Sequence, residues 1–292
     1  MLANREGLLL EWRLPGGARS WTEAAPLPGW STETVEDCVQ CLRRGEEFSP
    51  AAPASIRFAS SEVAFGTEGD TELPYPVRGQ ALIPADQTMG PADAPAGFST
   101  VKIKVGPDNF SQAIELAGEH GKTKKIRLDA NGTVSFSVWK KAPVALLQRL
   151  DYIEDPCGVA ELPDFLAWAA EKKIAVAKDA TTPQEARDFW RQGGSVVVAK
   201  PMVWGGFREV EEALVAAAAV NGRLVVSSSL ETSVGRTLLV RHLSALAWRE
   251  ASGVCTGFVF GGDALADKGV YSSSVRMSRE SWWGELRWIE RQ

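Results

Sequence analysis

The feature that most constrains the fold is a series of short apolar segments, each ending in one charged residue. Four of these charged residues recur at intervals of 25 positions, namely Lys104, Asp129, Glu154 and Asp179. A fifth apolar segment ends at Lys200 after a slightly shorter interval. Parallel strands need a crossover helix between them, and a strand with its helix takes about this length. The recurrence therefore predicts βα units with their charges gathered at one end of a barrel.

Apolar runs give the expected strand positions. They lie at residues 77–83, 101–105, 126–129, 152–155, 174–179, 196–200, 224–229 and 254–260. Helical patterns alternate with them at residues 109–120, 135–150, 162–173, 183–192, 207–221 and 234–250. Near-continuous apolar strands are typical of a sheet that is covered on both faces. We therefore expect an α/β protein with a modified (β/α) TIM-type barrel.

The N-terminal part predicts a smaller α+β domain. Strands are expected at residues 7–12 and 20–23, followed by a loop rich in proline and glycine at residues 24–30. Ser31 is the expected N-cap of a helix ending near Gly45, and a second helix is expected at residues 53–65. We assign residues 1–75 to a capping domain and 76–277 to the catalytic barrel. The tail at 278–292, with three tryptophans, is expected to pack back on the body.

Composition excludes several classes of protein. The 292 residues are 45% hydrophobic and 24% charged, which is typical of a globular protein and not of a disordered one. The net charge of −5 and the lack of a basic run argue against nucleic acid and anionic membrane as partners. The sequence shows neither a membrane span nor the layout of a signal peptide. We therefore expect a cytoplasmic enzyme that is a monomer or a weak homo-oligomer.

Cysteine and histidine offer little for chemistry. Cys38 and Cys41 form a C-x-x-C in a predicted helix, without a second pair or a nearby histidine. Two residues on one helix face are therefore favoured over the alternatives, a zinc site or a redox motif. Both histidines, His120 and His242, fall in predicted helices and not at strand ends. The chemistry must depend on lysines and carboxylates.

Side chains alternate across a strand, so residues two apart share a face. This places Lys102 beside Lys104, Arg127 beside Asp129, and Tyr152 beside Glu154 on the inner side of the barrel. Three carboxylates from neighbouring strands would then converge and raise one another's pKa. A hard divalent cation removes that repulsion, and Mg²⁺ suits oxygen ligands. The expected metal ligands are Asp129, Glu154 and Asp179.

The two lysines at the strand ends are expected to face each other across this metal. A lysine near a dication and a second ammonium has a lowered pKa, so it could act as a base. Such a base could remove a proton α to a carboxylate, while the metal stabilises the enediolate. Each motif alone has a simpler explanation, such as a solvated edge strand or a turn. Their joint order at successive strand ends favours a catalytic site.

These motifs resemble the enolase superfamily, in its muconate lactonizing subgroup. The matching residues are Lys102 and Lys104, Asp129-Ala130-Asn131, Glu154-Asp155-Pro156, Asp179, and Lys200-Pro201. The resemblance implies a lysine base and a Mg²⁺ cofactor, for which Mn²⁺ could substitute; this is the pattern described for the superfamily as a whole. The lack of a histidine at a strand end sets aside the mandelate racemase branch.

A closer resemblance is to the o-succinylbenzoate synthase family. It rests on residues 5–8, 23–31, 55–59, 126–131 and 227–235, and so covers nearly the whole chain. It implies a lyase of menaquinone biosynthesis that dehydrates 2-succinyl-6-hydroxy-2,4-cyclohexadiene-1-carboxylate in the syn sense. Lys104 would be the base and Lys200 would stay protonated. The candidate residues for binding this small carboxylate substrate are Lys102, Arg127, Asn131, Ser227, Ser228 and Ser229.

Two departures and two rivals remain. Ala180 follows Asp179 where the family usually has glutamate, and Gly261-Gly262-Asp263 resembles the family's closing loop only loosely. An N-acylamino acid racemase or dipeptide epimerase would use both lysines as bases, one for each face of the substrate. A non-catalytic barrel serving as a scaffold is the second rival. The intact charges at all five strand ends argue against that scaffold.

Overall fold

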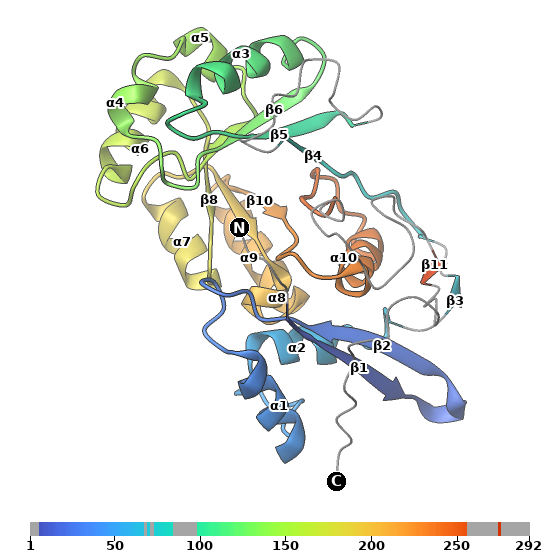
Figure 1. Cartoon of the computed structure of the whole chain (residues 1–292). Helices are drawn as coiled ribbons and strands as arrows, with labels where there is room; N and C mark the ends of the chain where they lie inside the picture. The colour runs from blue at the N-terminus through green and yellow to red at the C-terminus, as the bar shows by residue number, and fades with distance from the viewer. Residues whose placement is uncertain (1–5, 67–68, 71–72, 84–97, 256–273, 276–292) are drawn as a thin grey trace.

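The computed structural model describes residues 6–66, 69–70, 73–83, 98–255 and 274–275. Its largest feature is a curled sheet of seven parallel strands with helices outside it (Figure 1). In spatial order these are β10 (Arg223–Val226), β9 (Val196–Ala199), β8 (Val176–Asp179), β7 (Tyr152–Glu154), β6 (Lys125–Asp129), β5 (Thr100–Lys104) and β4 (Ala81–Ile83). Isolated bridges join Gly253 to Ser227 and Ser252 to Gly79, so one segment connects both edges of the sheet. The predicted barrel class is confirmed.

Helices follow the strands as expected. They are α3 (Phe110–His120), α6 (Leu162–Lys172), α7 (Pro183–Arg191), α9 (Phe207–Ala219) and α10 (Ser233–Ala245), with the short α8 (Pro201–Trp204) directly after Lys200. The single helix predicted at residues 135–150 was wrong. It is two short helices, α4 (Phe136–Trp139) and α5 (Val144–Leu147). Pro143 begins α5 and lacks the N–H that a continuous helix would need.

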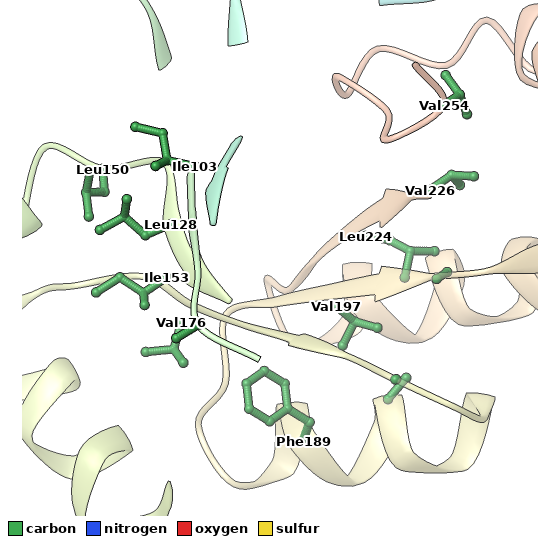
Figure 2. Packing of buried hydrophobic residues seen from close by; sticks show 14 of the residues in the cluster. Ile103, Leu128, Leu150, Ile153, Val176, Phe189, Val197, Leu224, Val226 and Val254 are labelled. Carbon is green, nitrogen blue, oxygen red and sulfur yellow. The ribbon is translucent and has the colours of Figure 1, made fainter. Parts of the chain in front are cut away.

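The main core lies between the sheet and these helices. Figure 2 shows side chains from successive strands in it, including Ile103, Leu128 and Ile153. Because these residues face the helices, the residues directly before and after each of them along the strand face the barrel interior. A second buried cluster, with Tyr152 and Val198, fills that interior. The alternation inferred for the lysines and carboxylates therefore agrees with the packing.

The N-terminal residues form an α+β layer at one end of the barrel (Figure 1). It contains the antiparallel hairpin of β1 (Leu8–Arg13) and β2 (Arg19–Ala24), followed by α1 (Val35–Arg44) and α2 (Ala54–Ser61). The N-cap of α1 is Thr34 and not Ser31, since Thr34 and Asp37 form a reciprocal capping box. The Ser31 hydroxyl instead accepts a hydrogen bond from the Leu27 N–H at 2.9 Å.

The C-x-x-C motif lies on the buried face of α1. Cys38 and Cys41 pack in a small core between α1 and α2, where burial raises the pKa of the Cys38 thiol to about 11. In the part of the chain that the structure describes, both cysteines are free thiols, and no metal-binding group of side chains includes them. The structural interpretation of this motif is therefore supported.

Other predictions fall partly outside the described residues. This holds for most of the expected strand at 254–260, the loop at 261–263 and the tail at 278–292. The domain boundary near residue 75 remains a prediction. A short antiparallel pair joins β3 (Gly69–Asp70) to β11 (Ser274–Val275). None of the described helices combines the length and the apolar character that crossing a membrane requires.

A buried carboxylate connects the two layers. Glu23 of β2 accepts hydrogen bonds from Thr232 N at 3.0 Å, Thr232 Oγ1 at 2.6 Å and Gly235 N at 2.9 Å. These donors lie at the N-terminus of α10, where a negative charge is favourable. Burial raises the pKa of Glu23, while the hydrogen bonds from Thr232 and Gly235 oppose that rise. The carboxylate holds α10 and the loop before it against the cap.

We expect Glu23→Gln to lower the free energy of unfolding by about 1–3 kcal/mol, because the amide NH₂ would face donors and leave them unpaired. Urea unfolding followed by circular dichroism measures this loss. Glu171→Gln is the control, since Glu171 is exposed and pairs only with Lys172 at the surface. Equal stability of the two variants would show that Glu23 does not hold the layers together.

Candidate active site

Strand register explains why equally spaced charges meet. Lys104 pairs with Asp129 across β5 and β6, and Asp129 pairs with Glu154 across β6 and β7. These three residues therefore lie at one level of the sheet. On β8, Ala177 and not Asp179 is opposite Glu154. Asp179 therefore lies two residues further toward the carboxyl end of the sheet. Lys200, just after β9, continues the same rise.

The first charged group contains two lysines and two carboxylates, from β5, β6 and β7. Lys102 Nζ lies 2.7 Å from Asp129 Oδ2 and 2.6 Å from Glu154 Oε1. Lys104 Nζ lies 2.7 Å from the same Asp129 oxygen and donates to Asn131 Oδ1 at 2.7 Å. The Lys102 side chain is 10% exposed and that of Lys104 is 28% exposed. Lys104 is thus the lysine of this pair that substrate could reach.

The pKa values in this group are shifted by burial and by the neighbouring charges, and the balance between the two differs from residue to residue. Burial opposes the charged form of Lys102, but the nearby Asp129 and Glu154 carboxylates prevail and raise its pKa. Burial likewise opposes ionisation of Asp129, but the Lys102 and Lys104 ammonium groups lower its pKa. For Glu154, burial and the charge of Asp129 raise the pKa to about 8. Glu154 therefore lacks enough positive charge nearby to balance its own.

A second charged group lies closer to the carboxyl end of the sheet, on β8 and just after β9. The Lys200 ammonium donates to Asp179 Oδ2 and lies 4.0 Å from the centroid of the Trp30 indole ring. Asp155 is also close, since burial and the charge of Asp179 raise its pKa to about 7. Lys104 ends β5 and Lys200 follows β9. The strands that carry the three carboxylates, β6, β7 and β8, lie between them in the sheet.

Tight turns hold the carboxylates at the strand ends. Asn131 and Asp155 adopt positive φ angles of 47° and 40°. The Asn131 N–H donates to Asp129 Oδ1 at 3.2 Å, a local bond that Asp at this position favours. Gly132 N–H donates to the Asp155 carbonyl at 2.8 Å, which ties the two loops together. The Asp-Ala-Asn and Glu-Asp-Pro motifs thus both form the tight turns after β6 and β7 and supply the carboxylates of the site.

Arg127 faces the barrel interior as expected, but its guanidinium is already occupied. It donates to Asp151 Oδ2 at 2.7 Å, Gln80 Oε1 at 2.6 Å and the Ala251 carbonyl at 2.8 Å. It also lies 4.7 Å from the centroid of the Tyr152 ring. These contacts join β6 to the segments at both edges of the sheet. Arg127 thus has a structural role in the barrel, and its role in substrate binding stays a prediction.

The predicted serines follow β10, next to β9, and the Ser227 N–H donates to the carbonyl of Ala199, the residue before Lys200. Ser228 and Ser229 are buried, and their hydroxyls both donate to the carboxylate of Glu231. Ser227 Oγ lies 3.3 Å from the Gly253 carbonyl. A role in binding a substrate carboxylate would therefore need Ser228 and Ser229 to leave Glu231, or would fall to the backbone of this loop.

The donor set of the carboxylates fits a hard divalent cation. Glu154 Oε2 and Asp179 Oδ1 are buried and have no hydrogen-bond partner among the described residues, so each has lone pairs that a metal could accept. With Asp129 they form an all-oxygen set on adjacent strands, as Mg²⁺ prefers. Among the described residues, no three acidic, cysteine or histidine side chains already form a metal-binding group. The ammonium groups of Lys102 and Lys200 pair with these carboxylates instead.

Sequence reasoning missed two residues of this site. Asp155 was only part of a turn motif, although it is a carboxyl group directly after a strand. Trp30 lies in the expected cap and no pattern indicated that its ring would reach Lys200. Its place in the loop rich in proline and glycine at residues 24–30, which is part of the resemblance to the o-succinylbenzoate synthase family, was the available signal.

Comparisons with known proteins show the family of the chain. A family model described as "Enolase C-terminal domain-like" matches residues 91–259. The o-succinylbenzoate synthase of Citrobacter koseri is 31% identical over 276 residues, which cover 87% of this chain and 84% of the relative. The enzyme of the same name from Klebsiella pneumoniae is 29% identical, with the same coverage of both chains. These relatives are lyases, and their matches cover more of the chain than the family model does.

Solved structures show the same fold. An o-succinylbenzoate synthase from Thermosynechococcus elongatus, complexed with Mg in the active site, superposes with a TM-score of 0.67 and 25% identity. The match covers 85% of this chain and 84% of that one. A muconate cycloisomerase from Pseudomonas fluorescens has a TM-score of 0.66 at 15% identity, covering 92% and 88%, which is a likeness of fold alone.

The pairing of Arg127 leads to a test. We expect Arg127→Lys to lower the free energy of unfolding by about 3–5 kcal/mol, because an ammonium cannot replace the forked contacts to Asp151 and Gln80. Chemical denaturation measures the change, and Arg191→Lys, at an exposed pair with Asp188, is the control. Unchanged stability with weakened substrate binding would instead place Arg127 in the substrate site.

Proposed function

Because the chain belongs to the enolase C-terminal domain-like family, we propose that it is an o-succinylbenzoate synthase. The reaction would be the syn dehydration of 2-succinyl-6-hydroxy-2,4-cyclohexadiene-1-carboxylate, as a step of menaquinone biosynthesis. The observation that carries this proposal is the match to relatives of that name across 87% of the chain. The two lysines on opposite sides of three carboxylates support it, since they are the groups this reaction needs.

Asp129, Glu154 and Asp179 are the proposed ligands of Mg²⁺, with Mn²⁺ as a substitute. When bound, the ion would neutralise these carboxylates and withdraw negative charge from the substrate carboxylate. Lys102 would remain behind the site, since it is buried between Asp129 and Glu154. We therefore assign Lys102 to balancing charge and not to direct contact with the substrate.

Lys104 is the proposed base. It would take the proton from the carbon next to the substrate carboxylate and deliver it to the departing hydroxyl on the same face. One C–H bond and one C–O bond break, water leaves, and the ring becomes aromatic. The partial exposure of Lys104 gives substrate access to its Nζ, and its bond to Asn131 Oδ1 orients that atom. Asn131 is thus a positioning residue in this proposal.

Lys200 is the proposed electrostatic partner. Its ammonium lies between the Asp179 carboxylate and the face of the Trp30 indole, and both groups attract a cation. A racemase or dipeptide epimerase would need Lys200 to give up its proton and act as a second base. A scaffold would have no use for this arrangement of buried charge.

The direct test is turnover of the cyclohexadiene substrate by the purified chain, followed by the loss of its diene absorbance. Formation of o-succinylbenzoate with release of water would support the proposal. No turnover, together with racemisation of N-acylamino acids, would favour the rival instead. The same two assays serve the variants below.

We expect activity to depend on a divalent cation. Exhaustive chelation should abolish turnover, and added Mg²⁺ should restore it. Glu154→Gln should weaken Mg²⁺ binding by about 10-fold or more in calorimetric titration, since it replaces an anionic ligand by a neutral one. The control Glu185→Gln, on α7 beside Lys178, should bind Mg²⁺ normally. Full activity after chelation would rule out the metal role of the carboxylates.

The two lysines should respond differently to arginine. We expect Lys104→Arg to lose about 10²–10⁴-fold in kcat, because guanidinium stays protonated and cannot accept a proton. Lys200→Arg should keep more activity, since it preserves the charge. Exchange of the α-proton in D₂O, measured by NMR, should likewise fail only without Lys104. Exchange by both variants, each with one enantiomer, would instead identify a racemase.

A further inference from the structure

The indole of Trp30 makes a contact that the proposed reaction does not by itself require. Trp30 belongs to the loop between β2 and α1, whereas Lys200 follows β9 of the barrel. Their side chains nonetheless meet, with the Lys200 Nζ lying 4.0 Å from the centroid of the ring. The Asp179 carboxylate binds the same ammonium. Lys200 is buried, so these two groups largely define where its charge lies.

The loop that carries Trp30 is held in one conformation. Trp30 N–H and Ser31 N–H both donate to the Leu27 carbonyl, at 2.9 Å and 2.8 Å, and Leu27 N–H donates to Ser31 Oγ at 2.9 Å. Gly29 supplies the positive φ angle of 82° that this tight turn needs. The loop is also fixed to the barrel, since Ala25 N–H lies 3.2 Å from Met202 Sδ, two residues after Lys200.

We propose that Trp30 is a positioning residue that holds the Lys200 ammonium at a fixed place beside the reacting carbon. A lysine has a flexible stem and a compact charge, so its head needs a second partner to stay in one position. Asp179 is one of the proposed metal ligands and would then share its oxygens. The indole face, the strongest of the aromatic partners for a cation, does not depend on that sharing. The cap thus supplies part of the catalytic geometry.

This inference rests on the proposed function for its kinetic consequence. Trp30→Leu removes the aromatic face but keeps an apolar side chain in the loop. We expect kcat to fall about 10-fold while KM changes less than about 2-fold, because the ammonium is displaced and the substrate pocket is retained. Trp30→Phe should recover most of kcat, since it restores an aromatic face. Trp12→Leu is the matched control, as Trp12 lies on β1 of the same cap and bonds to Thr22.

A readout independent of turnover uses NMR of lysines labelled with ¹³C at the ε carbon. The ring current of the indole should shift the Lys200 ε protons upfield, and Lys200→Arg identifies their resonance. The shift should vanish in Trp30→Leu, persist in reduced form in Trp30→Phe, and remain in Trp12→Leu. Absence of the shift from the wild-type protein would overturn the inference.

The two proposals can fail separately. If the wild-type protein does not turn over the cyclohexadiene substrate, the proposed function fails, and α-proton exchange of N-acylamino acids then reports on Lys200. The positioning role stands if Trp30→Leu slows that exchange and Trp30→Phe restores it. It falls if Trp30→Leu leaves kcat unchanged, or if only KM rises, because Trp30 would then be a substrate contact.

Discussion

The arrangement of the site depends on Lys102, buried between the carboxylates of Asp129 and Glu154. Two carboxylates at one level of adjacent strands would repel each other strongly in a barrel interior. The ammonium of Lys102 lies within 2.7 Å of both and offsets part of that repulsion, although the charge of Asp129 still raises the pKa of Glu154. A buried ion pair adds little net stability, because both charges lose their water. Lys102 instead allows the carboxylates of Asp129 and Glu154 to lie close together, as a metal site formed by them would require.

The site is also a joint product of cap and barrel. Glu23 fixes the N-terminus of α10 and hence the loop at residues 227–232, while Trp30 reaches Lys200 from the other side of the cap. Both contacts cross between segments that lie far apart in sequence. The barrel alone would present the lysines and carboxylates, but Lys200 would lose the Trp30 contact and keep Asp179, and the loop would lose the support of Glu23. This division explains why relatives that match most of the chain are informative about function.

The sequence predicted those parts of the structure that depend on local pattern and spacing. The strands, their order and the inward face of Lys104, Asp129 and Glu154 followed from alternation and from the 25-residue recurrence. The N-cap prediction at Ser31 failed, and three candidate substrate-binding side chains, whose role stays a prediction, have partners within the protein. Arg127 was taken by Asp151 and Gln80, Ser228 and Ser229 by Glu231, and Ser31 by Leu27, which left Thr34 to cap α1. A pattern shows which face a side chain takes, but not which partner it finds there.

The same alternation shows what the departure at Ala180 means. Asp179 faces the carboxylates, so the next residue must face the helices, and Ala180 indeed lies buried in the outer core. Its backbone is held on both sides, since Ala180 N–H donates to the Val198 carbonyl and its own carbonyl accepts from Trp204 Nε1 at 2.8 Å. The missing glutamate therefore leaves the inward-facing set of three carboxylates intact. The departure changes how β8 meets the helices and α8, and not which oxygens could bind a metal.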